Sequence, residues 1–535
     1  MPDVFIIKLR YYLRERMKRL TLLIFLLLAC LLLTGCIRVV SDDAPREAAP
    51  RAEEPRHEEP RPEEHHPEDE VPPEDPVRSK RPKYQPGELV DYTCGDGDTV
   101  EMLAARFNTT EEEIRKANPV LPEKTTTLPQ GLPLQIPIYY RIGWGSSYKM
   151  IPDALYVNGP AQKGFTARSY TDRQPGWFKY YNSYSDNKNQ RGGELIDYIA
   201  NSYSISPRLL LALLEYISHA LTDPNYRDDF NEISVFGFEG DKYRTLGGQL
   251  NQLADFLNER YYQYKAGKFI EYELQDGSLI RNDPWLNAAT VALQAYFAKV
   301  LPPEKYYEAI GPNGFVKTYK EMFGDFGDVD SYPAHLPGSL EQNKMRLPFK
   351  DGEAWTYTGG PHTAWGSNPP YSAIDFAPPA KEHGCFTSIA EVIAPADGNI
   401  VRTDTGMAMF DMDDDMDEHT GWVLLMLHLK TESIPPVGTH LNEGDFIGHP
   451  SCDGGTSSGT HVHIARKYNG EWIPAGGVIP MNFDDWIVED GDDSYTGYMR
   501  RYSTYVVASE TSEYFSRVLA GPPVYPTPTA TPVKK

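Results

Sequence analysis

Four histidines and one aspartate near the C-terminal end of the chain have the residue types of a metal site. His362 comes first, Asp375 follows at a spacing of thirteen (375 − 362), and His428, His461 and His463 come later. Side chains two residues apart on a β-strand face the same side, so His461 and His463 would stand next to each other. Two unpaired imidazoles on one face make a poor core, which favours a functional site.

The chemistry that suits these residues is zinc-dependent hydrolysis. A hydrolytic zinc ion uses three protein ligands and keeps a fourth position for water. The metal lowers the pKa of that water from about 15.7 to about 7, which makes hydroxide available at neutral pH. The candidate ligands are His362, Asp375 and His463, with His428 and His461 nearby.

Residues 358–472, which contain this constellation, resemble the lysostaphin-type (LytM) zinc metallopeptidases. The matching residues are 394–398, His428, 444–448 and 459–463. The commoner form of the family has a histidine four residues before the ligand aspartate, and here that position is Tyr371. The longer spacing from His362 to Asp375 resembles the beta-lytic branch of the same family.

This resemblance implies that His362, Asp375 and His463 bind Zn²⁺. It also implies that His428 and His461 are catalytic residues, which orient the water and stabilise the tetrahedral oxyanion. Either of these two can be the general base. The implied substrates are the peptide stems or cross-bridges of peptidoglycan.

The elements that must position these residues are short strands. Residues 389–401, 421–429 and 460–468 are strand-like and are separated by turns rich in Pro, Gly and Asp. No long amphipathic helix interrupts them. We therefore expect residues 349–519 to form an antiparallel all-β peptidase domain.

Cysteines and acidic residues in the same region offer other chemistry. Cys385 and Cys452 can form a disulfide in an exported protein or stay as buried thiols. No CxxC pair is present, which argues against a thiolate zinc site. The acidic run 411–418 lacks the central glycine of an EF-hand, which favours a solvated hairpin loop over a calcium site.

The N-terminal residues 1–36 have the pattern of an export signal. A short basic start at 17–19 precedes an apolar run over 20–33, which ends in Leu-Thr-Gly-Cys at Cys36. This ending resembles the lipobox of bacterial lipoproteins, which implies cleavage before Cys36 and lipidation of its thiol. We expect an exported protein, lipid-anchored to the bacterial membrane and facing the cell wall. The alternative is an uncleaved anchor helix.

Length and charge indicate a multidomain protein. A chain of 535 residues is too long for one hydrophobic core. The net charge of −24 argues against nucleic acid as a partner. Residues 37–88 are rich in Pro and Glu and poor in apolar residues, which predicts a disordered acidic tether. Residues 520–535 have the composition of a disordered tail.

Residues 89–139 predict a strand, two short helices and a second strand. Thr99 is placed to cap the first helix, and Thr109 or Thr110 the second. This segment resembles a LysM module, which implies a βααβ fold and binding to glycans of peptidoglycan. Asp98 and Asn118 are the candidate glycan-binding residues, or else they serve as turn and cap residues. Residues 140–192 are predicted to be an aromatic connecting segment.

Residues 193–332 predict a mainly α-helical domain, followed by a connector over 333–348. The run 207–218 is apolar nearly all round, which indicates a buried helix. This domain resembles lysozyme-like lytic transglycosylases, in which a glutamate immediately before a serine is the general acid. Here Ile217 precedes Ser218 and Glu215 lies two residues earlier, which predicts a domain without catalysis. Glycan cleavage through Glu215 is the alternative.

Together these patterns predict a cell-envelope zinc metalloendopeptidase that is docked on peptidoglycan by a LysM module. The rival hypothesis is a non-catalytic peptidoglycan-binding lipoprotein that activates an amidase partner or serves as a wall-remodelling scaffold. The five polar positions favour the enzyme, whereas Tyr371 favours the rival.

Overall fold

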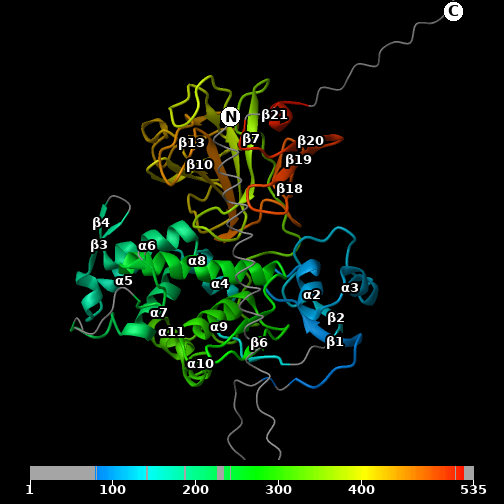
Figure 1. The fold of residues 1–535 in the computed structure, drawn as a ribbon, viewed down its shortest axis with the longest axis vertical. Coiled ribbons are helices and arrows are strands. Elements are labelled where there is room, and N and C mark those ends of the chain that lie inside the picture. The colour runs from blue at the N-terminus through cyan, green and yellow to red at the C-terminus, as the bar shows by residue number, and fades with distance from the viewer. Residues whose placement is uncertain are drawn as a thin grey trace, which may run out of the picture. The chain divides into compact units, whose positions relative to one another are not determined.

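The computed structural model describes residues 79, 81–139, 143–185, 188–225, 234–240, 243–511 and 514–522. The described residues all belong to one of the two units into which the chain divides, and Figure 1 shows their ribbon. The predicted signal, the lipidation site Cys36 and most of the tether lie outside the described residues. Among the residues that are described, no helix is long and apolar enough to cross a membrane.

The first ordered part is a small βααβ module. Its elements are β1 (Glu88–Thr93), α2 (Val100–Phe107), α3 (Glu111–Ala117) and β2 (Pro133–Ile138), and the two strands pair antiparallel. The hydroxyl of Thr99 accepts a hydrogen bond from the backbone N–H of Met102, and that of Thr110 accepts one from Glu113, so both helices are capped by side chains. The predicted order of elements is therefore present.

A helical region follows. Its longer helices are α6 (Gly192–Tyr203), α7 (Pro207–Ser218), α8 (Leu246–Lys265), α9 (Ala288–Val300) and α11 (Phe315–Phe323). Residues 207–218 form the expected buried helix α7. The segment 140–192 does not behave as a connector, because Met150, Tyr156 and Phe178 are buried in the same hydrophobic cluster as these helices. Its aromatic side chains carry enough apolar area to join the core.

The C-terminal part is built on one large antiparallel sheet. Its strand order is β13-β10-β11-β12-β15-β8-β7-β21, and β16 pairs with β15. The bounds are β7 (Ala354–His362), β8 (Ala373–Ala377), β10 (Gly398–Asp404), β11 (Met407–Asp411), β12 (Trp422–Leu427), β13 (His440–Leu441), β15 (Val462–Tyr468), β16 (Glu471–Trp472) and β21 (Arg517–Leu519). The antiparallel β domain expected from the sequence is present.

Smaller sheets complete this domain. Strands β17 (Asn482–Phe483), β18 (Trp486–Asp490), β19 (Gly497–Arg501) and β20 (Thr504–Val507) form one sheet, and β9 (Val392–Ile393) pairs with β14 (Phe446–Gly448). The strand expected over 389–401 is divided between β9 and β10. Pro395, which lies between them, cannot donate a ladder hydrogen bond.

Each face of the large sheet packs into a different core. Met409 and Leu425 belong to the hydrophobic cluster of the helical region, whereas Phe410 and Leu424, one residue away on each strand, belong to the cluster inside the β domain. Alternate side chains of a strand point to opposite faces. The helical region therefore covers an apolar face of the sheet that carries the candidate site.

The folded part begins before residue 88, the predicted end of the tether, and continues past residue 519, the last residue before the predicted tail. Arg81, within the predicted tether, forms an ion pair with Asp283 and lies 3.6 Å from the ring centre of Trp285. Ala520, predicted to open the tail, is buried and donates to the carbonyl of Glu353 at 3.0 Å. Both ends are ordered because they find partners in the folded domains.

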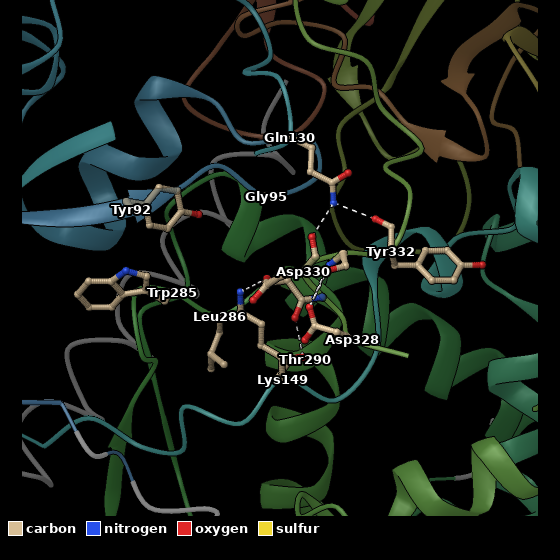
Figure 2. Close-up of polar contacts among 12 residues, drawn as sticks. Tyr92, Gly95, Gln130, Lys149, Trp285, Leu286, Thr290, Asp328, Asp330 and Tyr332 are labelled. Atoms are coloured by element: carbon tan, nitrogen blue, oxygen red, sulfur yellow. Dashed lines mark hydrogen bonds and ion pairs between the residues drawn. The ribbon is translucent and has the colours of Figure 1, made fainter. Parts of the chain in front are cut away.

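The segment 328–340 lies against the βααβ module. The side-chain amide of Gln130 donates to the carbonyls of Asp330 at 3.2 Å and Tyr332 at 2.8 Å, as Figure 2 shows. Asp96 accepts the backbone N–H groups of His335 and Leu336, each at 3.0 Å. The predicted connector is thus held by side chains of the module.

A buried ionic cluster joins this segment to the other parts of the chain. The two ring nitrogens of His335 contact Asp96 and Glu471, and Glu471 also pairs with Lys265 and accepts from the hydroxyl of Tyr261. Burial alone would lower the pKa of His335, but the two carboxylates outweigh it and raise the pKa to about 10. The βααβ module, the helical region and the β domain therefore meet at one protonated histidine.

Candidate metal centre

Three adjacent strands bring the predicted ligands together. His362 is the last residue of β7, Asp375 lies on β8 and His463 lies on β15. Asp375 and His463 are direct cross-strand partners in the register of β8 and β15. The pairing of β7 with β8 contains register shifts, which let His362 reach the same point.

The ligand atoms have the spacing of a tetrahedral zinc site. Nε2 of His362 lies 2.9 Å from Nδ1 of His463 and 3.3 Å from Oδ1 of Asp375, and the distance from Nδ1 of His463 to Oδ1 of Asp375 is 3.2 Å. Ligands at about 2.0–2.2 Å from a tetrahedral zinc lie roughly 3.3–3.6 Å apart, so two of the three distances are close to that range and the distance between the imidazole nitrogens is shorter. Among the described residues, these three form a group that could hold a metal ion.

Backbone carbonyls orient both imidazole ligands. Nδ1 of His362 lies 2.8 Å from the carbonyl of Gly360, and Nε2 of His463 lies 3.2 Å from the carbonyl of Ala364. Each of these nitrogens therefore carries the ring proton and donates a hydrogen bond to the carbonyl oxygen, because a carbonyl oxygen can only accept. The other nitrogen of each ring keeps its lone pair for the metal, which is the usual support for a metal-bound histidine.

The electrostatics suit a cation. Burial alone would raise the pKa of Asp375, but His362 and His463 hold it well below its usual range, so this carboxylate is ionised. Burial lowers the pKa of His463, and burial together with His461 and His463 lowers that of His428 to about 4. The rings of His463 and His428 are therefore neutral at pH 7, as metal ligation and proton acceptance require.

The two predicted catalytic histidines border this group. Nε2 of His461 lies 3.7 Å from Oδ1 of Asp375, and the ring centres of His428 and His461 are 4.5 Å apart. Nδ1 of His461 lies 2.8 Å from the carbonyl oxygen of Gly459, and Nδ1 of His428 lies 3.2 Å from that of Asp453. These contacts leave Nε2 of each ring available to a reacting molecule.

The five residues open into a cleft of about 690 Å³. Its walls include Trp365, Tyr495, Glu382 and Glu510. Tyr495, in the turn between β18 and β19, stacks on the ring of His362 with centroids 4.1 Å apart. Sequence reasoning missed Tyr495, because it lies outside residues 358–472 and no motif marks it.

A disulfide anchors one wall of the cleft. The structure joins Cys385 to Cys452, which is one of the two alternatives left open by the sequence. The neighbouring residues Gly384 and Phe386 line the cleft and hydrogen-bond to Thr460. Cys94, in the βααβ module, is a buried free thiol.

Tyr371 and the acidic loop 411–418, both singled out in the sequence, make contacts within the protein framework. Tyr371, at the position of histidine in the commoner family form, accepts a backbone hydrogen bond from Ala475 at 2.8 Å and does not join the ligand group. In the acidic loop, Asp411, Asp413 and Asp415 lie close together, yet the carboxylate of Asp411 accepts the N–H groups of Asp413 and Met416. It is a turn-forming residue.

The candidate glycan-binding residues belong to the framework of the βααβ module. Asp98 is buried and accepts from the hydroxyl of Tyr92 at 2.6 Å and from Arg106 at 3.0 Å. The side chain of Asn118 is also buried and bonds to the backbone of Ile114 and Gln135. Of the two readings of these residues, the contacts favour turn and cap residues over ligand contacts.

The side chain of Glu215 is also held by hydrogen bonds within the protein. Its carboxylate accepts the backbone N–H of Leu221 at 2.8 Å and the hydroxyl of Thr222 at 2.5 Å. It therefore closes the turn after α7, although it also lines a cavity of about 630 Å³. Glycan cleavage through Glu215 stays a prediction.

Comparison with known proteins connects the chain to proteases. Residues 149–335 match the family model described as "LasA, N-terminal domain". Two curated relatives, both named Protease LasA and from two strains of Pseudomonas aeruginosa, are 23% identical over 346 residues, covering 62% of this chain and 78% of each relative. The chain is therefore similar to a protease over most of that protease's length.

Three solved structures are similar to part of the chain. The M23 metalloprotease pseudoalterin from the deep sea is 24% identical, with a TM-score of 0.27, covering 31% of this chain and 96% of that one. A zinc-containing peptidase from Vibrio cholerae is 19% identical, with a TM-score of 0.20, covering 28% and 42%. The catalytic domain of lysostaphin from Staphylococcus simulans is 18% identical, with a TM-score of 0.17, covering 24% and 89%.

Proposed function

We propose that this protein is a zinc-dependent endopeptidase of the bacterial cell envelope that hydrolyses peptide stems or cross-bridges of peptidoglycan. The observation that carries the proposal is the group of His362, Asp375 and His463, whose ligand atoms lie 2.9, 3.2 and 3.3 Å apart. The similarity to protease LasA supports a peptidase.

Zinc bound by these residues would supply a Lewis acid and a water with a pKa near about 7. The protein supplies the rest. His428 and His461 offer two imidazoles on one side of the ligand group. One accepts a proton from the attacking water on Nε2 and later delivers it to the leaving amine. The other donates a hydrogen bond from Nε2 to the oxyanion of the substrate when its ring carries a proton on both nitrogens, because its Nδ1–H already points at a backbone carbonyl.

The cleft suits a polar peptide more than a bulky apolar ligand. It is wide, and its walls mix aromatic side chains with the carboxylates of Glu382 and Glu510. These acidic groups favour peptide segments that carry an amino group, because opposite charges attract across a cleft. Peptide stems of the cell wall that keep the free side-chain amine of a diamino acid have that chemistry.

Two finer parts of the proposal rest on the sequence. We infer lipid anchoring at Cys36 and docking of the βααβ module on glycan, which would raise the local concentration of substrate. Because Asp98 and Asn118 serve the framework of the module, a glycan would meet other residues. The complete ligand group supports the enzyme over the non-catalytic amidase activator.

The deciding experiment combines metal content with digestion. Purified protein should hold about one equivalent of zinc at neutral pH and release peptide fragments from peptidoglycan, read by mass spectrometry. His463→Ala should lose both, whereas His440→Ala, at an exposed position outside the cleft, should keep both. Wild-type protein with less than about a tenth of an equivalent of zinc would overturn the enzyme and favour the activator.

A further inference from the structure

The loop 363–368, which we call the cleft loop, connects the metal ligands to the helical region. It begins directly after His362, and its first four residues line the cleft. The carbonyl of Ala364 in this loop is the acceptor for Nε2 of His463, at 3.2 Å. The position of this carbonyl therefore decides whether His463 presents Nδ1 to the metal.

The far end of the cleft loop is held by a carboxylate from another region of the chain. Asp255 lies inside helix α8 and is only 7% exposed. Its Oδ1 accepts the backbone N–H of Ser367 at 3.0 Å, and its Oδ2 accepts the side-chain amide of Asn368 at 2.8 Å. A buried carboxylate is costly unless it is hydrogen-bonded, so its two oxygens are committed to this loop.

The fit between loop and helix is close. Gly366 has φ +88°, and a Cβ there would lie 2.4 Å from Oδ1 of Asp255 and 2.8 Å from a ring carbon of Tyr203. Ala364 is buried in the hydrophobic cluster of the helical region, and Trp365 packs against it. Residues 364–368 of the cleft loop therefore pack against the helical region.

We propose that Asp255 is a positioning residue for the zinc site, so that the helical region completes the metal centre of the β domain. Asp255 fixes the cleft loop, the loop fixes the carbonyl of Ala364, and that carbonyl fixes the orientation of His463. The inference rests on the proposed function, because it assigns Asp255 a role toward the zinc ligands. Asp255 touches neither metal nor substrate.

The test uses the full chain and measures zinc affinity by competition with a chelator. Asp255→Ala should raise the Kd for zinc by about tenfold or more, the range found when outer supports of a metal ligand are removed. Asp255→Asn should stay closer to wild type, since its amide oxygen can still accept from Ser367. The absorption spectrum of the Co²⁺-substituted protein should change in Asp255→Ala.

The matched control is Tyr262→Phe. Tyr262 lies on the same helix and accepts a hydrogen bond from the backbone of Trp472 in the β domain at 3.0 Å, but it does not touch the cleft loop. It should lose thermal stability and keep the zinc Kd within about twofold. If Asp255→Ala fails to fold, Asn368→Ala removes one of the two loop contacts and should weaken zinc binding by a smaller factor.

The outcomes separate the two levels of the proposal. Tight zinc binding by both wild type and Asp255→Ala would leave the enzyme standing and overturn the positioning role. Wild-type protein that binds no zinc would overturn the proposed function and the inference together. A higher Kd in Asp255→Ala with an unchanged Kd in Tyr262→Phe supports the role.

Discussion

The ring of Tyr495 lies parallel to the ring of His362, with centroids 4.1 Å apart and an interplanar angle of 17°. Tyr495 belongs to the turn before β19, and its carbonyl also accepts the backbone N–H of Gly360 at 2.9 Å. The turn between β18 and β19 thus contacts the first candidate ligand from outside the large sheet.

Tyr495→Ala should therefore weaken zinc binding. An aromatic pair contributes about 0.5–1.5 kcal/mol beyond its buried area, so the Kd should rise by roughly two- to tenfold. Tyr495→Phe keeps the stack and should bind zinc as wild type does. Chelator competition measures both, and equal Kd values in all three proteins would contradict a supporting role for this ring.

Gly359→Ala should damage the ligand group from within. A Cβ at Gly359 would lie 2.6 Å from Oδ2 of Asp375, closer than atoms approach without a shift. The carboxylate must move, so zinc content after dialysis should fall well below one equivalent. Gly95→Ala, where the nearest atom to the new Cβ lies at 3.4 Å, is the control and should keep its zinc.

The charged state of His335 should make stability fall at alkaline pH. Its pKa is raised from 6.5 to about 10 in the folded protein, so the stabilisation is fully present below pH 6.5 and is lost as pH rises toward 10. The free energy of unfolding, measured with urea, should drop over this interval. His335→Gln should flatten the drop, whereas His440→Gln should leave it unchanged.

Breaking the disulfide should affect substrate more than metal. The Cys385–Cys452 bond anchors a wall of the cleft but contains no ligand of the candidate metal group. The double substitution Cys385→Ser and Cys452→Ser should raise the KM for a peptide substrate by no more than about tenfold. A tenfold increase corresponds to a loss of about 1.4 kcal/mol in binding free energy. Zinc content should stay at one equivalent, and a loss of zinc would show that the wall also supports the ligands.

Sequence patterns predicted the candidate site better than its surroundings. Residue type and spacing mark His362, Asp375, His428, His461 and His463 as candidate site residues. These residues end or occupy strands whose alternation is visible along the chain, and the three candidate ligands are brought together. The choice of His362 over Tyr371 came from the resemblance to the beta-lytic branch, and in the structure His362 lies in the candidate ligand group whereas Tyr371 does not.

The surroundings of other residues depend on distant partners. Asp98 and Asn118 are polar residues of a module that resembles a glycan-binding one. Their side chains hydrogen-bond within the protein, Asp98 to Arg106 and Asn118 to the backbone of Gln135. Residues 140–192 lack a clear hydrophobic periodicity, so the sequence predicts a connecting segment. In the structure their aromatic side chains pack with the helices. Local patterns do not reveal which surface covers which.

The sequence by itself predicted the ligand set of the candidate metal site, since imidazole and carboxylate side chains suit zinc and the resemblance to the LytM family implies the same three residues. Only the tertiary structure decided how that set is held. Tyr495 stacks on His362, and Asp255 clamps the cleft loop from a helix 112 residues before Ser367. Such contacts follow from the packing of whole surfaces, and neither residue type nor spacing along the chain encodes them.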